Sequence, residues 1–386
     1  MDFSLTDEQK MIVQTVRAFV EKELLPHEED VERLDEVRPE LRRELIRRAG
    51  VAGLHAPNMP EQYGGGGLDT VAQTLMEREL GRVNYALGMC VVRPSNILQA
   101  CQGEQIERYL KPACTGERID CLAMTEPNAG SDVRAMELRA ERQGGDFVLT
   151  GSKHFISHAD VADFAIVFAV TGVETTARGP RKQITAFLVD RGTPGFNINK
   201  GYHVVSHRGY HNCILEFDGC RVPAGNILGD EGRGFDVANT WLSATRLAVA
   251  AVCVARAQRA LELCQQWAAT RRQFGQAIGK FQGTSFKLAD MAVQIRAAEL
   301  LTLQTAWKQD RGEARDEDFA MAKLYASEML ALVTDHAVQI FGGMGLAEEN
   351  VIARLWRDAR VERIWDGTSE IQRHIISRAL LRPYEH

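Results

Sequence analysis

Residues Arg360–Arg373 read Arg-Val-Glu-Arg-Ile-Trp-Asp-Gly-Thr-Ser-Glu-Ile-Gln-Arg, and this stretch predicts a helix, a break and a second helix. Gly367 supplies a flexible joint at the break, because glycine has no Cβ to restrict its backbone. Thr368 can cap the helix that follows, since a threonine side chain accepts a hydrogen bond from the first helical turn. Isoleucines at helical spacing predict a buried stripe on this second helix. They are Ile371, Ile375 and Ile376.

Asp366 stands just before the glycine joint, beside Trp365. A carboxylate held on a rigid corner can be directed at a reacting C–H bond. The same position also suits an ordinary carboxylate near the N-terminus of a helix, where the helix dipole favours negative charge. Spacing alone leaves both interpretations open.

Composition limits the possible classes of protein. The chain has 386 residues, is 45% hydrophobic and carries a formal net charge of -6, which predicts two or three domains. No long Lys/Arg block is present, so nucleic acid is not expected as a partner. The eight cysteines are scattered and lack metal-ligand spacing, so we expect no metal site, no disulfide scaffold and reduced thiols in the cytoplasm.

The distribution of apolar residues indicates whether the chain has a signal peptide or a membrane span. The first residues lack a basic region followed by an apolar run, so no signal peptide is expected. Charged residues interrupt the longest apolar runs well short of a membrane span, so we expect no membrane association.

The pattern along the chain predicts an α+β protein with three domains. Residues 1–118 form an N-terminal helical domain, in which Thr6 caps a first helix that Pro26 ends. Residues 119–232 form a small antiparallel β-barrel or sandwich, and residues 233–386 form a C-terminal helical bundle of the four-helix type. The strand runs are 147–150, 165–170, 184–189 and 214–217, and the long helices are 235–269, 281–309 and 319–341.

This order of domains, together with an acidic residue before Gly-Thr-Ser, resembles the acyl-CoA dehydrogenases over essentially the whole chain. In most of that family the acid is Glu, whereas here it is Asp366, which is one methylene shorter. The resemblance implies an FAD enzyme in which Asp366 takes the α-proton of an acyl-CoA and flavin N5 takes the β-hydride. It also implies a 2-enoyl-CoA product and an electron-transfer flavoprotein as electron acceptor.

The segment Met124–Asp132 predicts a tight turn that presents backbone N–H groups. It is similar to the flavin-binding segment of the family. That similarity implies that this region lines the flavin, with Ser131 also near the coenzyme A chain. The residues concerned are Leu122, Met124, Thr125, Gly130 and Ser131.

A second cofactor segment is Phe155-Ile156-Ser157, where the family usually has Trp-Ile-Thr. The resemblance implies an aromatic ring beside the flavin and a hydroxyl reaching its N5. Alternation along a strand places His154 and His158 on the opposite face, so we expect both at the surface.

Three further segments resemble family contacts to FAD. Arg271 and Phe274 resemble a segment that contacts the flavin pyrophosphate of a neighbouring subunit, and a guanidinium suits a diphosphate. A glycine-rich helix end resembles contacts to the adenine across a subunit interface, which implies a homo-oligomer, most simply a tetramer. The remaining residues of this set are Gln339, Gly342, Gly343, Thr368 and Glu370.

The resemblance also implies a substrate site. Arg246 lies in an apolar helix next to Thr245, where some members of the family carry their catalytic Glu, so Asp366 is the only aligned base. Arg93 falls at the acyl end of the implied pocket, and it can either bind a polar acyl tail or face solvent. The substrate residues are Ser131, Ser243, Arg246, Gly367, Arg378 and Arg93.

Two other functions stay open at this point. A flavin oxidase on the same fold, such as a nitroalkane oxidase, also uses an Asp base and needs no coenzyme A. A homologue could instead bind FAD and acyl-CoA without redox chemistry, or eliminate a leaving group. The set Ser131, Ser243, Arg246 and Arg378 favours a coenzyme A ligand over the oxidase, and the retained carboxylate favours chemistry over a scaffold.

Overall fold

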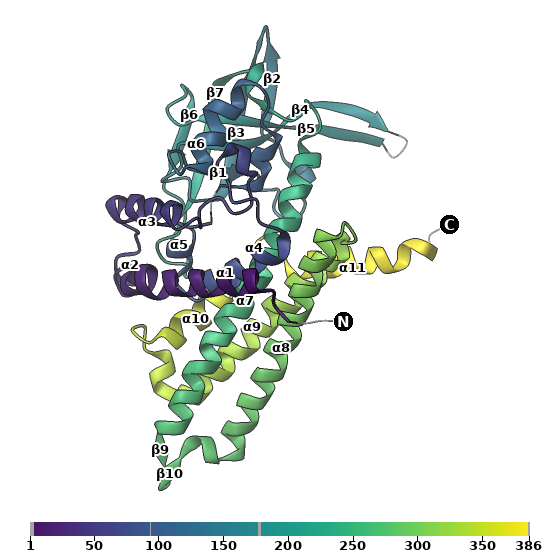
Figure 1. Ribbon diagram of the computed structural model, residues 1–386. Coiled ribbons are helices and arrows are strands. Elements are labelled where there is room, and N and C mark those ends of the chain that lie inside the picture. Colours follow the sequence, from purple (N-terminus) through teal and green to yellow (C-terminus); the bar gives the residue numbers. More distant parts are fainter. Residues whose placement is uncertain (1–3, 93, 177–178, 385–386) are drawn as a thin grey trace.

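The computed structural model describes residues 4–92, 94–176 and 179–384. Arg93, and with it the prediction about an acyl tail, lies outside the described residues. The chain has a helical N-terminal part, a central β-sheet and a C-terminal helical bundle, which confirms the α+β architecture (Figure 1).

The N-terminal part begins with α1 (Asp7–Phe19), which is held by a capping box between Thr6 and Gln9. The prediction that Pro26 ends this helix is wrong. The chain stays helical through a π turn and a 3-10 turn, because Pro26 stands in the first turn of the latter, where no N–H is needed. The other elements are α2 (Glu28–Leu34), α3 (Pro39–Val51), α4 (Thr70–Leu80), α5 (Tyr85–Gly88) and α6 (Lys111–Cys114).

The central sheet has eight strands in the order β6-β7-β3-β2-β4-β5-β8, with β1 paired to β4. Most pairs are antiparallel, as the sequence predicts, but β1 and β2 each meet β4 in parallel. The strands are β1 (Asp120–Ala123), β2 (Arg139–Gln143), β3 (Asp146–Ser157), β4 (Phe164–Thr176), β5 (Gly179–Asp190), β6 (Phe196–Asn199), β7 (Asn212–Pro223) and β8 (Ile227–Leu228).

Both faces of this sheet are buried. Along β4, Phe164, Ile166 and Phe168 pack into a core with the N-terminal helices and the start of α7. The intervening residues pack into a second core formed by the strands themselves. Alternate residues of a strand point to opposite faces, so a strand buried on both sides reads as the continuous apolar run seen at 165–170.

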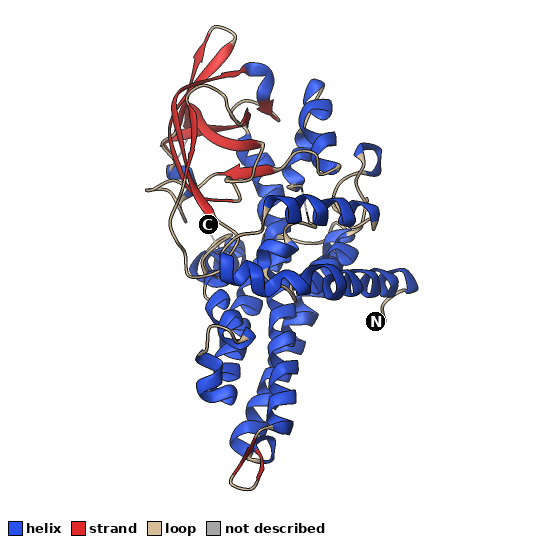
Figure 2. Cartoon of the chain, turned by 90° about the vertical axis from the view of Figure 1, so that its left-hand side faces the viewer, coloured by secondary structure: helices blue, strands red, loops and turns tan. Residues whose placement is uncertain are grey.

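The bundle is built from long helices that match the predicted segments closely (Figure 2). A short hairpin of β9 (Arg272–Gln273) and β10 (Gln276–Ala277) joins α7 to α8 at the end farthest from the central sheet (Figure 1). The helices are α7 (Gly234–Thr270), α8 (Gln282–Asp310), α9 (Asp316–Phe341), α10 (Val351–Ala359) and α11 (Ser369–Leu381).

Two segments, Gly234–Thr270 and Asp316–Leu346, are long and apolar enough to cross a membrane by length and composition alone. The expectation that charges keep every apolar run short of a span is therefore too strict. In the most apolar windows of the two segments, 50% and 39% of the residues are buried inside this chain. Both helices contribute to the core of the bundle, and a core helix passes the same length and hydropathy test as a membrane span.

Helix α11 projects from the body of the molecule and carries the C-terminal end of the chain (Figure 1). The predicted stripe of Ile371, Ile375 and Ile376 is only half-buried, because little of this chain reaches that face of the helix. Leu380 and Leu381 near the end of the helix are exposed. All eight cysteines are free and buried, and no metal-binding group of His, Cys, Asp and Glu is found among the described residues.

Candidate active site

Asp366 lies at the break between a 3-10 turn (Val361–Arg363) and α11, as the sequence predicts. Its φ of 53° and the φ of 91° at Gly367 are both left-handed, and this is an uncommon conformation for Asp. The φ of Gly367 would strain any other residue, and an added Cβ would lie 2.6 Å from Gln372 Nε2, so both observations favour glycine there. Gln372 Nε2 donates to Asp366 O (3.2 Å) and to Gly367 O (2.9 Å), which fixes the corner from the helix side.

The helix after the corner starts as predicted. The Thr368 hydroxyl accepts a hydrogen bond from Ile371 N at 3.3 Å, which is the bond expected of an N-cap. The glycine and the cap fix the chain directly after Asp366, and this limits the directions in which its side chain can leave the backbone.

Asp366 is half-buried in this chain, and several charged side chains lie near its carboxyl group. Its pKa is raised to about 6, mainly by burial and also by the charge of Glu362, whereas the charge of Lys323, a hydrogen bond with Thr245 and the charge of Arg246 oppose the rise. A carboxyl group with a pKa near neutral is suited to accept a proton and release it again. A charged environment of this kind is also a recognised property of functional sites.

Arg246 lies on α7 beside this carboxyl group and is only 8% exposed. Its Nε has no hydrogen-bond partner in the part of the chain that the structure describes. Burial lowers its pKa, and the charges of Asp316 and Asp366 oppose this effect. A buried guanidinium with an unused donor is suited to a carbonyl or an anion supplied by a ligand.

A second set of charges lies beneath the corner. Glu362 is completely buried and accepts hydrogen bonds from Arg256 and from Trp365 Nε1. His207 lies between two carboxylates, with Nε2 3.2 Å from Glu362 and Nδ1 3.7 Å from Asp358. These contacts hold Trp365, the residue directly before Asp366, against the core.

Aromatic rings connect this corner to the central sheet. Trp365 stacks on His207 with ring centroids 4.8 Å apart, and Tyr85 lies 5.1 Å from Trp365. The loop that carries His207 also carries Tyr202, whose ring centroid is 5.0 Å from that of Phe155. Phe155 is one of the predicted flavin contacts, so this loop spans from the predicted cofactor segment to the corner.

The two predicted cofactor segments of the β domain lie side by side. Backbone hydrogen bonds between Glu126 and Ala129 close the predicted turn, and His154 N donates to Thr125 O at 2.8 Å. Lys153 is completely buried, and its Nζ donates to Glu126 (2.7 Å) and to Met124 O (2.9 Å). We did not predict this pair from the sequence. The available signal was a lysine placed shortly after a predicted strand, between residues of the two cofactor segments.

Phe155, Ile156 and Ser157 have different surroundings. Phe155 is 53% exposed with a φ of 54°, Ile156 is buried, and the Ser157 hydroxyl donates to Asn212 at 3.0 Å. The prediction that His158 lies at the surface is wrong, since it is buried. The register of β3 shifts between Lys153 and Ile156, so simple alternation does not hold beyond that point.

The predicted cofactor residues Arg271, Phe274, Gln339, Gly342 and Gly343 lie at the opposite end of the molecule. Arg271 lies over the ring of Trp267, which stacks on Phe341 just before Gly342. The β9–β10 hairpin carries Phe274, which is 95% exposed, far from the central sheet (Figure 1). Gln339, Gly342 and Gly343 are exposed near this end of the bundle. Within one chain, the cofactor residues of the β domain and those at this end of the bundle are therefore two separate groups, whereas Thr368 and Glu370 lie next to the Asp366 corner.

The chain matches three protein-family models: the acyl-CoA dehydrogenase N-terminal domain over residues 6–117, the middle domain over 121–220 and the C-terminal domain over 232–381. It belongs to the acyl-CoA dehydrogenase family. It is 36% identical to a probable acyl-CoA dehydrogenase of Bacillus subtilis, over 99% of this chain and 100% of the relative. It is 37% identical to the mitochondrial short-chain specific acyl-CoA dehydrogenase of Homo sapiens, over 98% and 92%.

Solved structures agree with this assignment. The butyryl-CoA dehydrogenase of Megasphaera elsdenii matches this acyl-CoA dehydrogenase homologue with a TM-score of 0.91 and 35% identity, over 99% of this chain and all of that chain. The chain is therefore similar to acyl-CoA dehydrogenases along its whole length, in sequence and in fold.

The predicted substrate residues of this family member are spread over the structure. Arg246 and Gly367 lie at the Asp366 corner, and Ser243 is half-buried on the same helix as Arg246. Ser131 is exposed in the β domain, and Arg378 is exposed on the projecting helix α11. Among the remaining predicted cofactor residues, Gly130 and Glu370 are also exposed, and Leu122 is half-buried.

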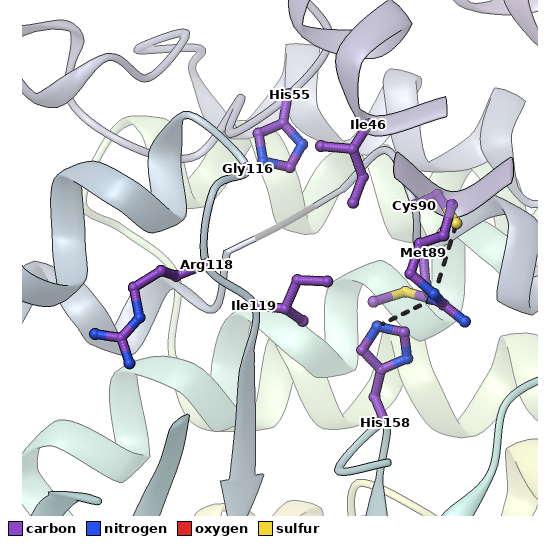
Figure 3. Close-up of a pocket in the computed structure, with 9 residues that line it drawn as sticks. Ile46, His55, Met89, Cys90, Gly116, Arg118, Ile119 and His158 are labelled. Carbon is purple, nitrogen blue, oxygen red and sulfur yellow. Dashed lines mark hydrogen bonds between the residues drawn. The ribbon is translucent and has the colours of Figure 1, made fainter. Parts of the chain in front are cut away.

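A pocket elsewhere in this dehydrogenase homologue lies between α3 and the start of the central sheet (Figure 3). Buried Arg42 faces it, with Nη1 3.4 Å from His158 Nε2. None of the residues that line this pocket is among the predicted catalytic, cofactor or substrate residues.

Proposed function

We propose that this protein is an FAD-dependent dehydrogenase of acyl-CoA thioesters in which Asp366 removes the α-proton. The observation that carries the proposal is the corner itself, where a carboxyl group with a pKa near 6 forms a hydrogen bond with Thr245 and lies near buried Arg246. An α-C–H of a thioester is a weak acid, so its removal requires a base within roughly 3 Å and electrostatic help at the carbonyl oxygen.

Groups of this chain can provide that help. The backbone N–H of Asp366 donates to no backbone carbonyl in the described part of the chain, so a thioester oxygen can accept a hydrogen bond from it. Arg246 adds a positive charge close to Asp366 and holds the carboxylate in its ionised, proton-accepting form. FAD, when bound, would supply the acceptor for the β-hydride.

The residues of the β domain fit a flavin. The turn closed by Glu126 and Ala129 presents backbone groups, Phe155 exposes an aromatic face, and Ser157 supplies a hydroxyl. A similar chain, 29% identical with a TM-score of 0.89, was solved as the FAD complex of PigA, which supports FAD as the cofactor. Arg271 and the glycines after Phe341 would hold the diphosphate and adenine ends.

A single chain keeps these two groups of residues apart, and this supports a homo-oligomer in which each FAD lies between two subunits. We infer a tetramer, because the exposed apolar residues of α11 give a second surface that this chain does not cover.

Electron-transfer flavoprotein is the proposed electron acceptor. A similar chain comes from a structure on the electron transferring flavoprotein of Acidaminococcus fermentans, with a TM-score of 0.90. A cytoplasmic location is proposed from the eight free thiols.

Purified protein is expected to be yellow and to contain close to one FAD per chain, measured by absorbance after the flavin is released. Acyl-CoA thioesters should then bleach the flavin without oxygen, and nitroalkanes should not. A protein that bleaches with nitroalkanes and reoxidises rapidly in air would instead be the oxidase, and one that takes up no FAD would contradict the proposal.

The rate of flavin reduction is expected to depend on pH through Asp366. Because the carboxyl group must be ionised to accept a proton, kcat/KM should fall as pH drops through about 6, which is the pKa raised by burial. Asp218→Asn, at an exposed position of strand β7, serves as a matched control and should show the wild-type profile. An acid limb near pH 4, the ordinary range of an exposed carboxylate, would contradict the assignment.

A further inference from the structure

Lys323 lies in the middle of α9, which is otherwise apolar at this level, and its side chain is 0% exposed. Its Nζ donates to Gly367 O at 2.8 Å, and this carbonyl is its one hydrogen-bond acceptor in the described part of the chain. Gly367 directly follows Asp366, so the lysine contacts the same corner that carries the proposed base.

A buried ammonium group is unfavourable unless charge and hydrogen bonds compensate for its lost hydration. Burial lowers the pKa of Lys323, and the charges of the Asp366 and Glu362 carboxylates oppose that effect. Glu362 is already occupied by Arg256 and Trp365. Asp366 makes no ion pair in the described residues, so Lys323 acts on it through a nearby charge and not through direct contact.

We propose that Lys323 is a positioning residue for the base: its bond to Gly367 O holds the left-handed corner, and its charge keeps the Asp366 carboxylate ionised. The inference rests on the proposed role of Asp366. Lys323 does not touch substrate in this arrangement and acts only through the corner.

The structure contains an internal control for this idea. Gln372 is also completely buried, and its Nε2 donates to the same carbonyl at 2.9 Å, but it carries no charge. Loss of Gln372 therefore removes a bond from the corner without changing its electrostatics. Loss of Lys323 changes both.

The test uses the FAD-loaded protein and three variants: Lys323→Gln, which keeps a donor but removes the charge, Lys323→Met, which removes both, and Gln372→Met. The carboxyl stretch of protonated Asp366 is identified in the infrared spectrum as the band that Asp366→Asn removes, and it is followed against pH. This readout needs no substrate. The acid limb of flavin reduction by an acyl-CoA is the second readout.

Removal of a positive charge next to a carboxylate raises its pKa, by roughly one to three pH units when the charge is within contact distance. Both Lys323 variants should therefore raise the infrared midpoint and move the acid limb to higher pH. Gln372→Met should lower the rate at every pH and leave the midpoint in place. Lys323→Gln carries the test if Lys323→Met does not fold.

An unchanged infrared midpoint in Lys323→Gln would overturn the inference and leave Lys323 with a structural role only. Failure of the proposed function has a different result. In that case the infrared midpoint of the Lys323 variants still differs from that of the wild type, but no acyl-CoA bleaches the flavin in any of the proteins.

Discussion

Asp366→Asn should slow flavin reduction by an acyl-CoA by roughly two to four orders of magnitude, which is the usual contribution of a positioned general base. Asparagine keeps the size and polarity of the side chain but cannot accept the proton. FAD and acyl-CoA should still bind, because Arg246, Gly367 and the Thr368 cap are unchanged. Anaerobic stopped-flow absorbance measures the rate, and ligand binding is measured separately by titration.

An acyl-CoA with no hydrogen on its β-carbon isolates the step assigned to Asp366. It cannot pass a hydride to the flavin, so exchange of its α-hydrogen in heavy water reports proton removal alone. Wild type should catalyse this exchange and Asp366→Asn should not. An Asn variant that exchanges and bleaches as fast as wild type would refute the role of Asp366.

Asp366→Glu tests the effect of the shorter side chain. If the pocket is shaped around Asp, the extra methylene crowds the α-carbon and lowers the rate with the preferred thioester. A Glu variant that keeps or raises activity on straight-chain thioesters would show that the pocket accepts either acid. Relatives named for short-chain and butyryl-CoA substrates make short thioesters the first to test.

Two variants that each lose FAD should restore binding when they are co-expressed. Arg271→Glu places a negative charge next to the negatively charged flavin diphosphate. Phe155→Glu places a negative charge next to the flavin ring. The loss of charge-assisted hydrogen bonds at Arg271 should weaken FAD binding by roughly ten- to a hundredfold. Because the two residues lie at opposite ends of one chain, each site would combine Phe155 of one subunit with Arg271 of another.

Random pairing of the two variants makes about half of the pairs mixed. In each mixed pair, one site combines the two unmodified residues and the other combines the two substituted ones. About a quarter of the wild-type flavin should therefore return. Flavin content per chain of the co-expressed protein measures this directly. No recovery above the single variants, or a light-scattering mass near the 43.0 kDa of one chain with flavin bound, would contradict a shared site.

Regular features of the fold could be predicted from the sequence. Helices α7, α8 and α9 are long and begin within a few residues of the predicted positions, since their periodic apolar residues extend over many turns. The break at Gly367 and the Thr368 cap were also predictable, because glycine and threonine act there through local geometry. Both of these predictions depend on residues close together in the chain.

Features that depend on distant residues were not predictable in the same way. His158 is buried because it lies in the turn that follows β3, with a left-handed φ of 68°, where strand alternation no longer applies. Leu380 and Leu381 of α11 stay exposed because that helix projects from the body of the molecule. Lys323 could only have been suspected, as a charged residue in an apolar helix, and Glu362 looked like an ordinary charged residue between two arginines until the fold placed both beneath Asp366.

The most direct test of the central claim is a single anaerobic turnover of the FAD-loaded protein with a panel of acyl-CoA thioesters. Flavin absorbance and the mass of the thioester are followed together. The account predicts that at least one thioester bleaches the flavin, with one 2-enoyl-CoA formed for each flavin reduced, and that Asp366→Asn forms almost none in the same time. Flavin that stays oxidised with every thioester, or bleaching that leaves the thioester unchanged in mass, would contradict it.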